Sequence, residues 1–339
     1  MYVLKRLWVK VIKLNTWVLF AASILLILFS TYIMVAIEPE TFSKPFDAFW
    51  WVMTTVTTVG YGDFYPSSIG GRLYAIFLYI IGIGLIGVAI GKVIDGFGMF
   101  RRRKEEGLLT YKQEGHIVII GWSQKARFAI EEIMNGVDFQ QEIVIIDQLG
   151  KSPFLHESVH YIQGDPAEED VLMRANLPKA KAVLLFADDT IQDPLLTDGK
   201  TLLIVTSIER LSPDIHSTVE IMSEAHIKNF RHVKVDEFIL SHETISRLAV
   251  RSAITKGISK IYSQLMSRGI GDNLYEIKVR SHWKTYRDAF DELFKEGATL
   301  IADGEKMDIN RRMDDEISSK SQLFVICDHT SYEMIQSKA

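Results

Sequence analysis

The chain has 339 residues, of which 47% are hydrophobic and 24% are charged, and its formal net charge at pH 7 is -5. This net charge by itself indicates nothing about nucleic-acid binding, and no nucleic-acid partner is expected. The single cysteine, Cys327, excludes an intramolecular disulfide and a cysteine-rich metal site, and its apolar surroundings indicate a buried strand residue.

The first expected element is a membrane-spanning helix over residues 16–37, a stretch without a charged residue. About 20 consecutive apolar residues suffice for a helix to cross the hydrocarbon core of a bilayer. A signal peptide is the alternative, but its hydrophobic region is usually shorter and no small-residue cleavage motif follows Ile37. Basic residues at positions 5, 6, 10 and 13 precede the stretch, which predicts a cytoplasmic N-terminus.

A shorter apolar helix is expected over residues 45–56, because Pro45 suits the first turn of a helix. It is followed directly by Thr57-Thr58-Val59-Gly60-Tyr61-Gly62-Asp63. The two glycines can adopt positive φ at low steric cost, so consecutive carbonyl oxygens can face one way while the larger side chains face the other way. A glycine-rich turn of a soluble loop is the alternative, which the long apolar segments on both sides disfavour.

The run from Thr58 to Gly62 resembles the selectivity filter of potassium channels, in which carbonyl oxygens replace the hydration shell of the ion. The resemblance implies that potassium ions are held by Thr58, Val59, Gly60 and Tyr61, with the Thr58 hydroxyl adding a ring of oxygens. Such a ring needs several copies of the motif around one axis. The expected assembly is therefore a homotetramer in membrane lipid.

A second membrane span is expected over residues 73–94, where Lys92 is the single charged residue. Basic residues at positions 101–104 follow it, so both flanks should be cytoplasmic and the protein should be a multi-pass protein of the plasma membrane. The span contains Gly82, Gly84, Gly87 and Gly91. Close packing through the Gly87–Gly91 pair is one explanation, and a gating hinge at Gly82 or Gly84 is the interpretation that we favour.

The remaining sequence alternates short apolar runs with helical patterns, which predicts a Rossmann-like parallel sheet of βαβ units. Strands are expected over residues 116–120, 142–147, 159–163, 182–187, 217–222 and 237–240. Helices are expected over residues 123–135, 168–176, 195–210 and 224–233. In such a sheet a ligand should bind in the crevice at the carboxyl ends of the strands.

The first strand leads into Gly121-Trp122-Ser123-Gln124-Lys125-Ala126, a turn that departs from the dinucleotide motif GxGxxG at its second and third glycines. Gly121 still permits a tight turn, and the start of the next helix favours an anion. Asp147 ends the second strand, where an acidic residue can bond a ribose. A turn that binds nothing is the alternative. The candidate nucleotide contacts are Gly121, Trp122, Ser123, Asp147 and Asp165.

Nearly the whole chain resembles prokaryotic potassium channels with two membrane spans and a C-terminal RCK domain (regulator of potassium conductance), particularly the calcium-gated ones. The resemblance rests on the filter, on His116-Ile117-Val118-Ile119-Ile120-Gly121-Trp122-Ser123 and on Gly164-Asp165-Pro166. It implies a pore domain over residues 1–100 and a linker over residues 101–114. A Rossmann-like N-lobe over residues 115–254 should follow and include a swap helix near residues 242–253. Residues 255–339 should form a connecting helix and a small α+β C-terminal lobe. It also implies an octameric RCK ring, to which separately made RCK subunits can contribute.

In calcium-gated members of this family, carboxylates near the fourth and fifth strands hold the ion. Glu220 matches one such position, whereas Met222 stands where a second carboxylate is expected. The nearby aspartates at 188, 189, 193 and 198 align poorly and are equally well explained as a solvated loop. In the pore, Thr54 stands where some relatives carry an acidic partner for the aspartate matching Asp63.

These observations predict a ligand-gated, potassium-selective channel, not an enzyme, in which an RCK ring opens a gate on the inner helix. The gating ligand is either a divalent cation such as calcium, held by Glu220 with nearby aspartates, or an adenine nucleotide on residues 121–123 with its ribose near Asp147. The family resemblance favours the cation, despite Met222. Two other classes of protein are alternatives to a channel. One is a membrane-anchored NAD-dependent enzyme, which would need a catalytic acid or base beside the nucleotide, and the other is a regulatory subunit of a transporter.

Overall fold

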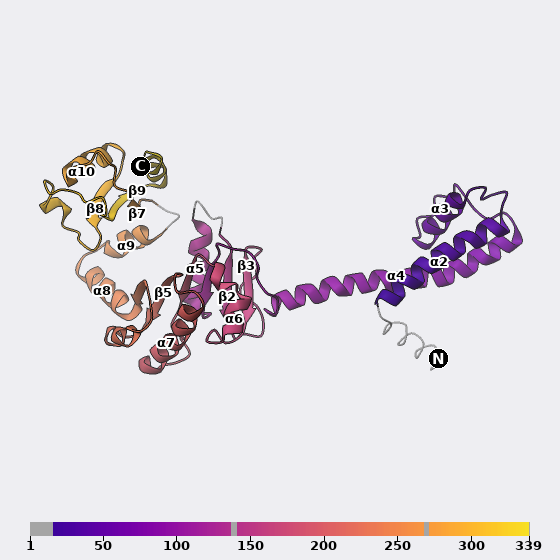
Figure 1. The fold of residues 1–339 in the computed structure, drawn as a ribbon, viewed down its shortest axis with the longest axis horizontal. Helices are drawn as coiled ribbons and strands as arrows, with labels where there is room; N and C mark the ends of the chain where they lie inside the picture. Colours follow the sequence, from indigo (N-terminus) through magenta and orange to yellow (C-terminus); the bar gives the residue numbers. More distant parts are fainter. Residues whose placement is uncertain (1–15, 137–140, 268–270, 339) are drawn as a thin grey trace. The chain divides into compact units, whose positions relative to one another are not determined.

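The computed structural model describes residues 16–136, 141–267 and 271–338 of the chain (Figure 1). The basic residues at positions 5–13, from which the orientation of the N-terminus was predicted, lie outside these ranges. The chain divides into two compact units, Met1–Arg103 and Lys104–Ala339, which are described separately below.

The described residues of the first unit form the helices α2 (Thr16–Ile37), α3 (Pro45–Val56) and α4 (Ile69–Glu105). Within the described residues, α2 and α4 are long and apolar enough to cross a membrane, and α2 has the predicted bounds. α4 extends beyond the predicted span of residues 73–94 at both ends. Its last turns contain arginine, lysine and glutamate, which are good helix formers, so the helix continues into the predicted linker.

The core of this unit lies between α3 and the two long helices. Trp51, Val52 and Val56 of α3 are buried and pack with Met34 of α2 and Leu78 of α4. A Cβ atom on Gly82 would lie 2.7 Å from Cγ1 of Val56, so close packing against α3 explains this glycine. A Cβ atom on Gly84 would meet nothing within 4 Å. Of the two predicted hinge positions, Gly84 is therefore the one without a packing role in the chain.

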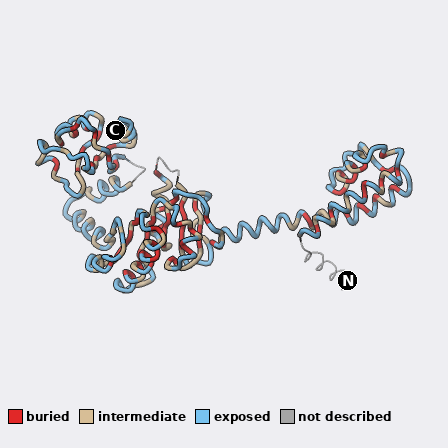
Figure 2. Tube along the Cα trace, in the orientation of Figure 1, coloured by how far each residue is buried: buried red, intermediate tan, exposed pale blue. Residues whose placement is uncertain are grey.

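The second unit begins with a six-stranded parallel sheet in the order β3-β2-β1-β4-β5-β6. This is the predicted Rossmann-like arrangement, and each strand lies within two residues of its predicted bounds. The strands are β1 (Ile117–Ile120), β2 (Ile143–Asp147), β3 (Val159–Gln163), β4 (Ala182–Leu185), β5 (His216–Ile221) and β6 (Glu237–Leu240). Figure 2 shows that buried residues concentrate on these strands.

Helices cover both faces of the sheet. α5 (Gln124–Asn135) packs against one face, where its Ala126 and Ile130 contact Ile119 and Ile145. α6 (Glu169–Arg174) and α7 (Pro194–Leu211) cover the opposite face, and the short 3₁₀ segment η1 (Leu177–Lys179) follows α6.

One predicted helix takes a different form. Residues 224–233 were expected to be α-helical, but the structure has a 3₁₀ segment there, η2 (Glu224–Phe230). His226 bonds Asp198 and Phe230 is buried in the core. Because the segment is short, these tertiary contacts outweigh its intrinsic preference for an α-helix.

The predicted swap helix forms as α8 (Ser241–Ile254), which has no buried residue in the described chain: its residues are exposed or of intermediate burial (Figure 2). α9 (Ile258–Met266) follows it and leads to the C-terminal lobe. That lobe is an antiparallel sheet in the order β7-β9-β8 with two helices, which agrees with the predicted α+β character. Its elements are β7 (Asn273–Ile277), α10 (Tyr286–Lys295), β8 (Thr299–Asp303), η3 (Ile309–Arg311), β9 (Leu323–Cys327) and α11 (His329–Ser337).

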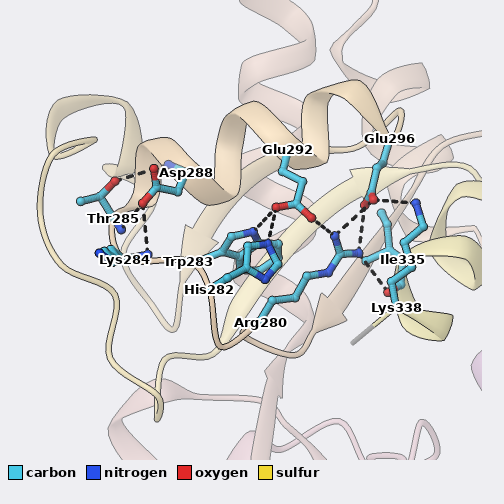
Figure 3. Close-up of polar contacts among 10 residues, drawn as sticks. All are labelled: Arg280, His282, Trp283, Lys284, Thr285, Asp288, Glu292, Glu296, Ile335 and Lys338. Carbon is cyan, nitrogen blue, oxygen red and sulfur yellow. Dashed lines mark hydrogen bonds and ion pairs between the residues drawn. The ribbon is translucent and has the colours of Figure 1, made fainter.

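A partly buried ion-pair network joins the segment that follows β7 to α10 and α11 in this lobe (Figure 3). Arg280, whose side chain is 4% exposed, bonds Glu292 and lies 2.9 Å from Oε2 of Glu296. Its Nη2 also donates to the carbonyl oxygen of Ile335 at 3.2 Å. Burial by itself would raise the pKa of Glu292, but hydrogen bonds from His282, Trp283 and Arg280 lower it to about 2.

Arg280→Met should destabilise the C-terminal lobe, because it removes the buried cation shared by Glu292 and Glu296 and leaves them only their more exposed partners, such as Lys338. Breaking a buried ion pair from one side typically costs about 3–5 kcal/mol. Hydrogen exchange of the β7 and β9 amides in the full-length protein should therefore become faster. Arg287→Met is the matched control, since Arg287 pairs with Asp314 at the surface. Equal exchange rates in the two variants would contradict a structural role for the network.

Candidate functional site

The predicted filter segment follows α3 without an intervening loop. Gly60 and Gly62 both have positive φ, +56° and +76°, as the alternation of small and large residues predicts. Thr58 also has a positive φ of 63°, which is uncommon for a residue other than glycine. The segment from Thr57 to Tyr61 is exposed in the single chain, so its polar groups are available to other copies.

Contacts with α3 support this unusual backbone. The carbonyl oxygen of Thr54 accepts the backbone N–H groups of Val59 at 2.9 Å and Gly60 at 3.0 Å. The indole Nε1 of Trp50 donates to Oδ2 of Asp63 at 2.8 Å, and the Trp50 ring stacks on Tyr61 with centroids 5.8 Å apart. The sequence indicated only that Thr54 replaces the acidic partner that some relatives provide for the aspartate matching Asp63. Trp50 was overlooked, because an indole N–H carries no charge that would mark it.

Glu38 is a second residue that sequence reasoning missed. It follows α2 and is 4% exposed, and its carboxylate accepts the Ser68 backbone N–H at 2.7 Å and the Ser67 hydroxyl at 3.0 Å. Ser68 directly precedes α4, so a negative charge is held where a helix N-terminus favours it. A Cβ atom on Gly71 would lie 2.3 Å from this carboxylate. Glu38 therefore ties the end of α2 to the start of α4.

The predicted ligand crevice exists at the carboxyl ends of β1, β2 and β4. It encloses about 250 Å³ and brings together three of the five candidate nucleotide contacts, Gly121, Trp122 and Asp147. The other two lie outside its lining: the Ser123 hydroxyl caps α5 by accepting the Ala126 N–H, and Asp165 accepts the Ala167 N–H.

Backbone and carboxylate groups define one wall of the crevice. Gly121 has a φ of +86°, and a Cβ atom there would lie 3.3 Å from the carbonyl oxygen of Phe186. Oδ2 of Asp147 accepts the Trp122 N–H at 2.7 Å, and Oδ1 accepts the Leu149 N–H at 3.2 Å. The turn thus leaves the Asp147 carboxylate at the crevice, beside the N-terminus of α5.

The opposite wall contains polar side chains that, apart from Asp188, the sequence did not single out. Lys200 and Thr201 of α7 line it together with Asp188 and Thr190. Nζ of Lys200 lies 2.6 Å from Oδ2 of Asp188. Burial by itself would raise the pKa of Asp188, but hydrogen bonds from Lys200 and Thr190 lower it to about 2. A residue in the middle of a helix gives no local signal that tertiary packing will bring it to the crevice.

Glu220, the predicted calcium ligand, is 2% exposed at the end of β5. Its oxygens lie 3.0 and 2.8 Å from Nζ of Lys125 and also accept the Ala187 N–H at 2.9 Å. Lys125 also lies 2.6 Å from Asp189. Burial by itself would lower the pKa of Lys125, but its bonds to Asp189 and Glu220 raise it instead.

The other predicted aspartates have local structural roles. Asp193 caps α7, and Asp198 accepts the Met222 and Ser223 N–H groups. No group of three or more histidine, cysteine, aspartate or glutamate side chains has metal-binding geometry within residues 16–136, 141–267 and 271–338.

Lys125→Met should destabilise the Rossmann-like lobe, because the buried Glu220 loses its cationic partner. Leaving a buried acceptor unsatisfied typically costs about 1–3 kcal/mol. Thermal unfolding of the purified protein should shift to lower temperature. Arg127→Met is the matched control, since Arg127 lies on the same helix but pairs with Glu131 at the surface. An unchanged midpoint for Lys125→Met would show that the Lys125–Glu220 pair contributes nothing measurable.

Comparison with known protein families divides the chain as the fold does. A family model described as "Ion channel" matches residues 17–97, and one described as "TrkA-N domain" matches residues 117–241.

Known potassium channels match both parts of the chain. The putative potassium channel protein YugO of Bacillus subtilis is 30% identical over 224 residues, which is 66% of this chain and 67% of that protein. The calcium-gated potassium channel TvoK of Thermoplasma volcanium is 28% identical over 267 residues, which is 77% of this chain and 76% of that protein.

Among solved structures, the human SLO3 gating ring matches with a TM-score of 0.50 and 13% identity over 65% of this chain and 45% of that chain, a likeness of fold alone. The relatives named here are channels, which does not support a membrane-anchored enzyme. The chain belongs to the family of potassium channels in which an ion-channel pore domain is followed by a TrkA-N (RCK) domain.

Proposed function

We propose that four copies of this chain form a potassium-selective pore in the plasma membrane, and that an adenine nucleotide bound to the cytoplasmic RCK domain controls its opening. Potassium ions are held by the oxygens of Thr58, Val59, Gly60 and Tyr61. Both termini lie in the cytoplasm, and the RCK domains form an octameric ring with or without separately made subunits.

The geometry of the filter segment supports the pore. Positive φ at alternate positions is what turns successive carbonyl oxygens toward one side of a chain. The contacts with Thr54 and Trp50 that hold this backbone are made within one chain. Preorganised oxygens can replace a hydration shell at little cost in reorganisation.

The crevice beside Asp147 is the observation that carries the choice of ligand. A carboxylate at the end of β2 suits the hydroxyl groups of a ribose. The amides at the start of α5 suit a phosphate, and Gly121 leaves room for a close approach of the backbone. Lys200 on the opposite wall is a positive group that a phosphate would share with its ion-pair partner Asp188. The crevice therefore combines an apolar floor with groups that match both ends of a nucleotide.

Calcium is the second candidate, because the relative TvoK is named as calcium-gated. Calcium takes six to eight oxygen ligands. Both oxygens of Glu220 already bond the Lys125 ammonium, and Met222 supplies no carboxylate. An ammonium group bound between Glu220 and Asp189 occupies the place a cation would need. We therefore favour the nucleotide.

Opening of the pore requires movement of α4, which runs without a break from Ile69 to Glu105. We propose that ligand binding changes the shape of the RCK ring and pulls on the segment after α4. Gly84 is then the hinge, because its position has open space around it and no packing role.

Gly62→Ala should abolish potassium selectivity. Open space surrounds the added Cβ atom, so the effect arises from the backbone: Gly62 has a φ of +76°, which strains an alanine. The potassium-to-sodium permeability ratio of the purified protein in planar bilayers measures it. Gly91→Ala is the control, since it adds a methyl group to open space within a helix. Retained selectivity in Gly62→Ala would refute the filter assignment.

Asp147→Ala should remove the response of the channel to adenine nucleotides, because the ribose loses its carboxylate partner. Single-channel recording with ATP or NAD, and separately with calcium, on the cytoplasmic side measures open probability. Glu220→Gln tests the calcium candidate in the same recordings. A wild-type response to calcium that Glu220→Gln abolishes would overturn the nucleotide proposal.

Truncation after Arg103 tests control by the RCK domain itself. The truncated pore should remain selective but respond to neither ligand, because it retains the filter and lacks both candidate sites. A truncated channel that still responded to nucleotide would refute gating through the ring.

A further inference from the structure

The crevice and the chain segment that leaves α4 meet at the same edge of the sheet. α4 ends at Glu105, whose carbonyl oxygen accepts the backbone N–H of Ser152 at 2.7 Å. Ser152 belongs to the loop after β2, and Gln148 and Leu149 of that loop line the crevice. The wall of the crevice and the bond to the end of α4 are thus parts of one short loop.

Gly107 provides a second attachment of this segment to the sheet. Its carbonyl oxygen accepts the Gln163 N–H at 3.0 Å and Nη1 of Arg174 at 3.1 Å. Its φ is +69°, and a Cβ atom there would lie 2.5 Å from the backbone N of Gln163 and 2.7 Å from Cδ1 of Tyr161. The segment after α4 therefore lies directly on the end of β3, in contact with the Tyr161 ring.

Tyr161 connects this attachment to the crevice. Its hydroxyl donates to the carbonyl oxygens of Asp147 at 2.9 Å and Leu149 at 2.6 Å, which belong to two residues of the crevice lining. The side chain is 1% exposed and packs among Ile119, Ile143 and Ile145. A ring held in a close-packed core cannot move at its contact with Gly107 without also moving its hydroxyl, which contacts the crevice.

We infer that Tyr161 and Ser152 couple occupancy of the crevice to the segment that follows α4. We call this set the tether anchor: Glu105, Gly107, Ser152, Tyr161 and Gln163. The inference rests on the proposed nucleotide site. A ribose hydroxyl that bonds Asp147 shares the carboxylate with the Trp122 and Leu149 N–H groups, so ligand binding acts directly on the backbone of residues 147–149. That action reaches Gly107 through Tyr161 and reaches Glu105 through Ser152.

Tyr161→Phe in the full-length tetramer in lipid tests the inference, because it removes the hydroxyl and keeps the packed ring. Binding of ATP and NAD is measured by calorimetry, and open probability is recorded at saturating nucleotide. The affinity should stay within a few-fold of wild type. The nucleotide-induced shift of the opening equilibrium should fall by about fivefold or more, the lower end of typical allosteric coupling. Tyr286→Phe is the matched control, since it removes a buried hydroxyl that bonds Asp303 in the C-terminal lobe.

Ser152 offers an independent variant pair. Ser152→Pro removes the N–H that bonds Glu105 and should uncouple the channel in the same way, whereas Ser152→Ala keeps that N–H and should respond normally. Normal affinity with a normal response in both Tyr161→Phe and Ser152→Pro would overturn this inference alone. Loss of affinity in Tyr161→Phe with a normal response at saturation would also overturn it. Absence of nucleotide binding by the wild-type channel would overturn the proposed function, and this inference with it.

Discussion

The parallel pairing of β1, β2 and β3 is the constraint on which the soluble domain depends. Parallel strands end at one edge of a sheet, so Asp147 at the end of β2 is the register partner of Gln163 at the end of β3. The crevice forms at this edge because the chain leaves the sheet at the end of each strand. The segment that leaves α4 attaches to the same edge through Gly107 and Ser152. Ligand site and mechanical attachment are therefore neighbours because of the topology itself.

The pore domain depends on a different constraint, which is the conformation of a few residues after α3. A row of carbonyl oxygens that face one way requires left-handed backbone angles, and Thr58 adopts one without being a glycine. Strain of this kind persists only where surrounding contacts over-determine the backbone. The bonds from Thr54 and the Trp50–Asp63 contact supply that support. α3 is therefore the support of the filter as well as a part of the hydrophobic core.

Buried charges in this protein are compensated in three different ways. Backbone and hydroxyl donors surround Glu38, a lysine pairs with Glu220, and two glutamates pair with Arg280. Burying an ionised group costs free energy unless partners of this kind are present. Glu220 illustrates the consequence for function. A carboxylate that matches a metal-ligand position in relatives can serve a lysine of its own chain instead, because both cations satisfy the same oxygens.

The sequence alone determined the elements whose signals are local. The span of α2 follows from an uninterrupted apolar run, and the sheet follows from alternating apolar runs. The positive φ angles in the proposed filter segment follow from the spacing of Gly60 and Gly62. The tertiary structure alone decided which distant side chains meet. Trp50 and Asp63 are 13 residues apart, Lys125 and Glu220 are 95 apart, and Lys200 reaches the crevice from the middle of α7. Such pairings depend on how helices pack on the sheet and on α4, and no periodicity in the chain records that packing.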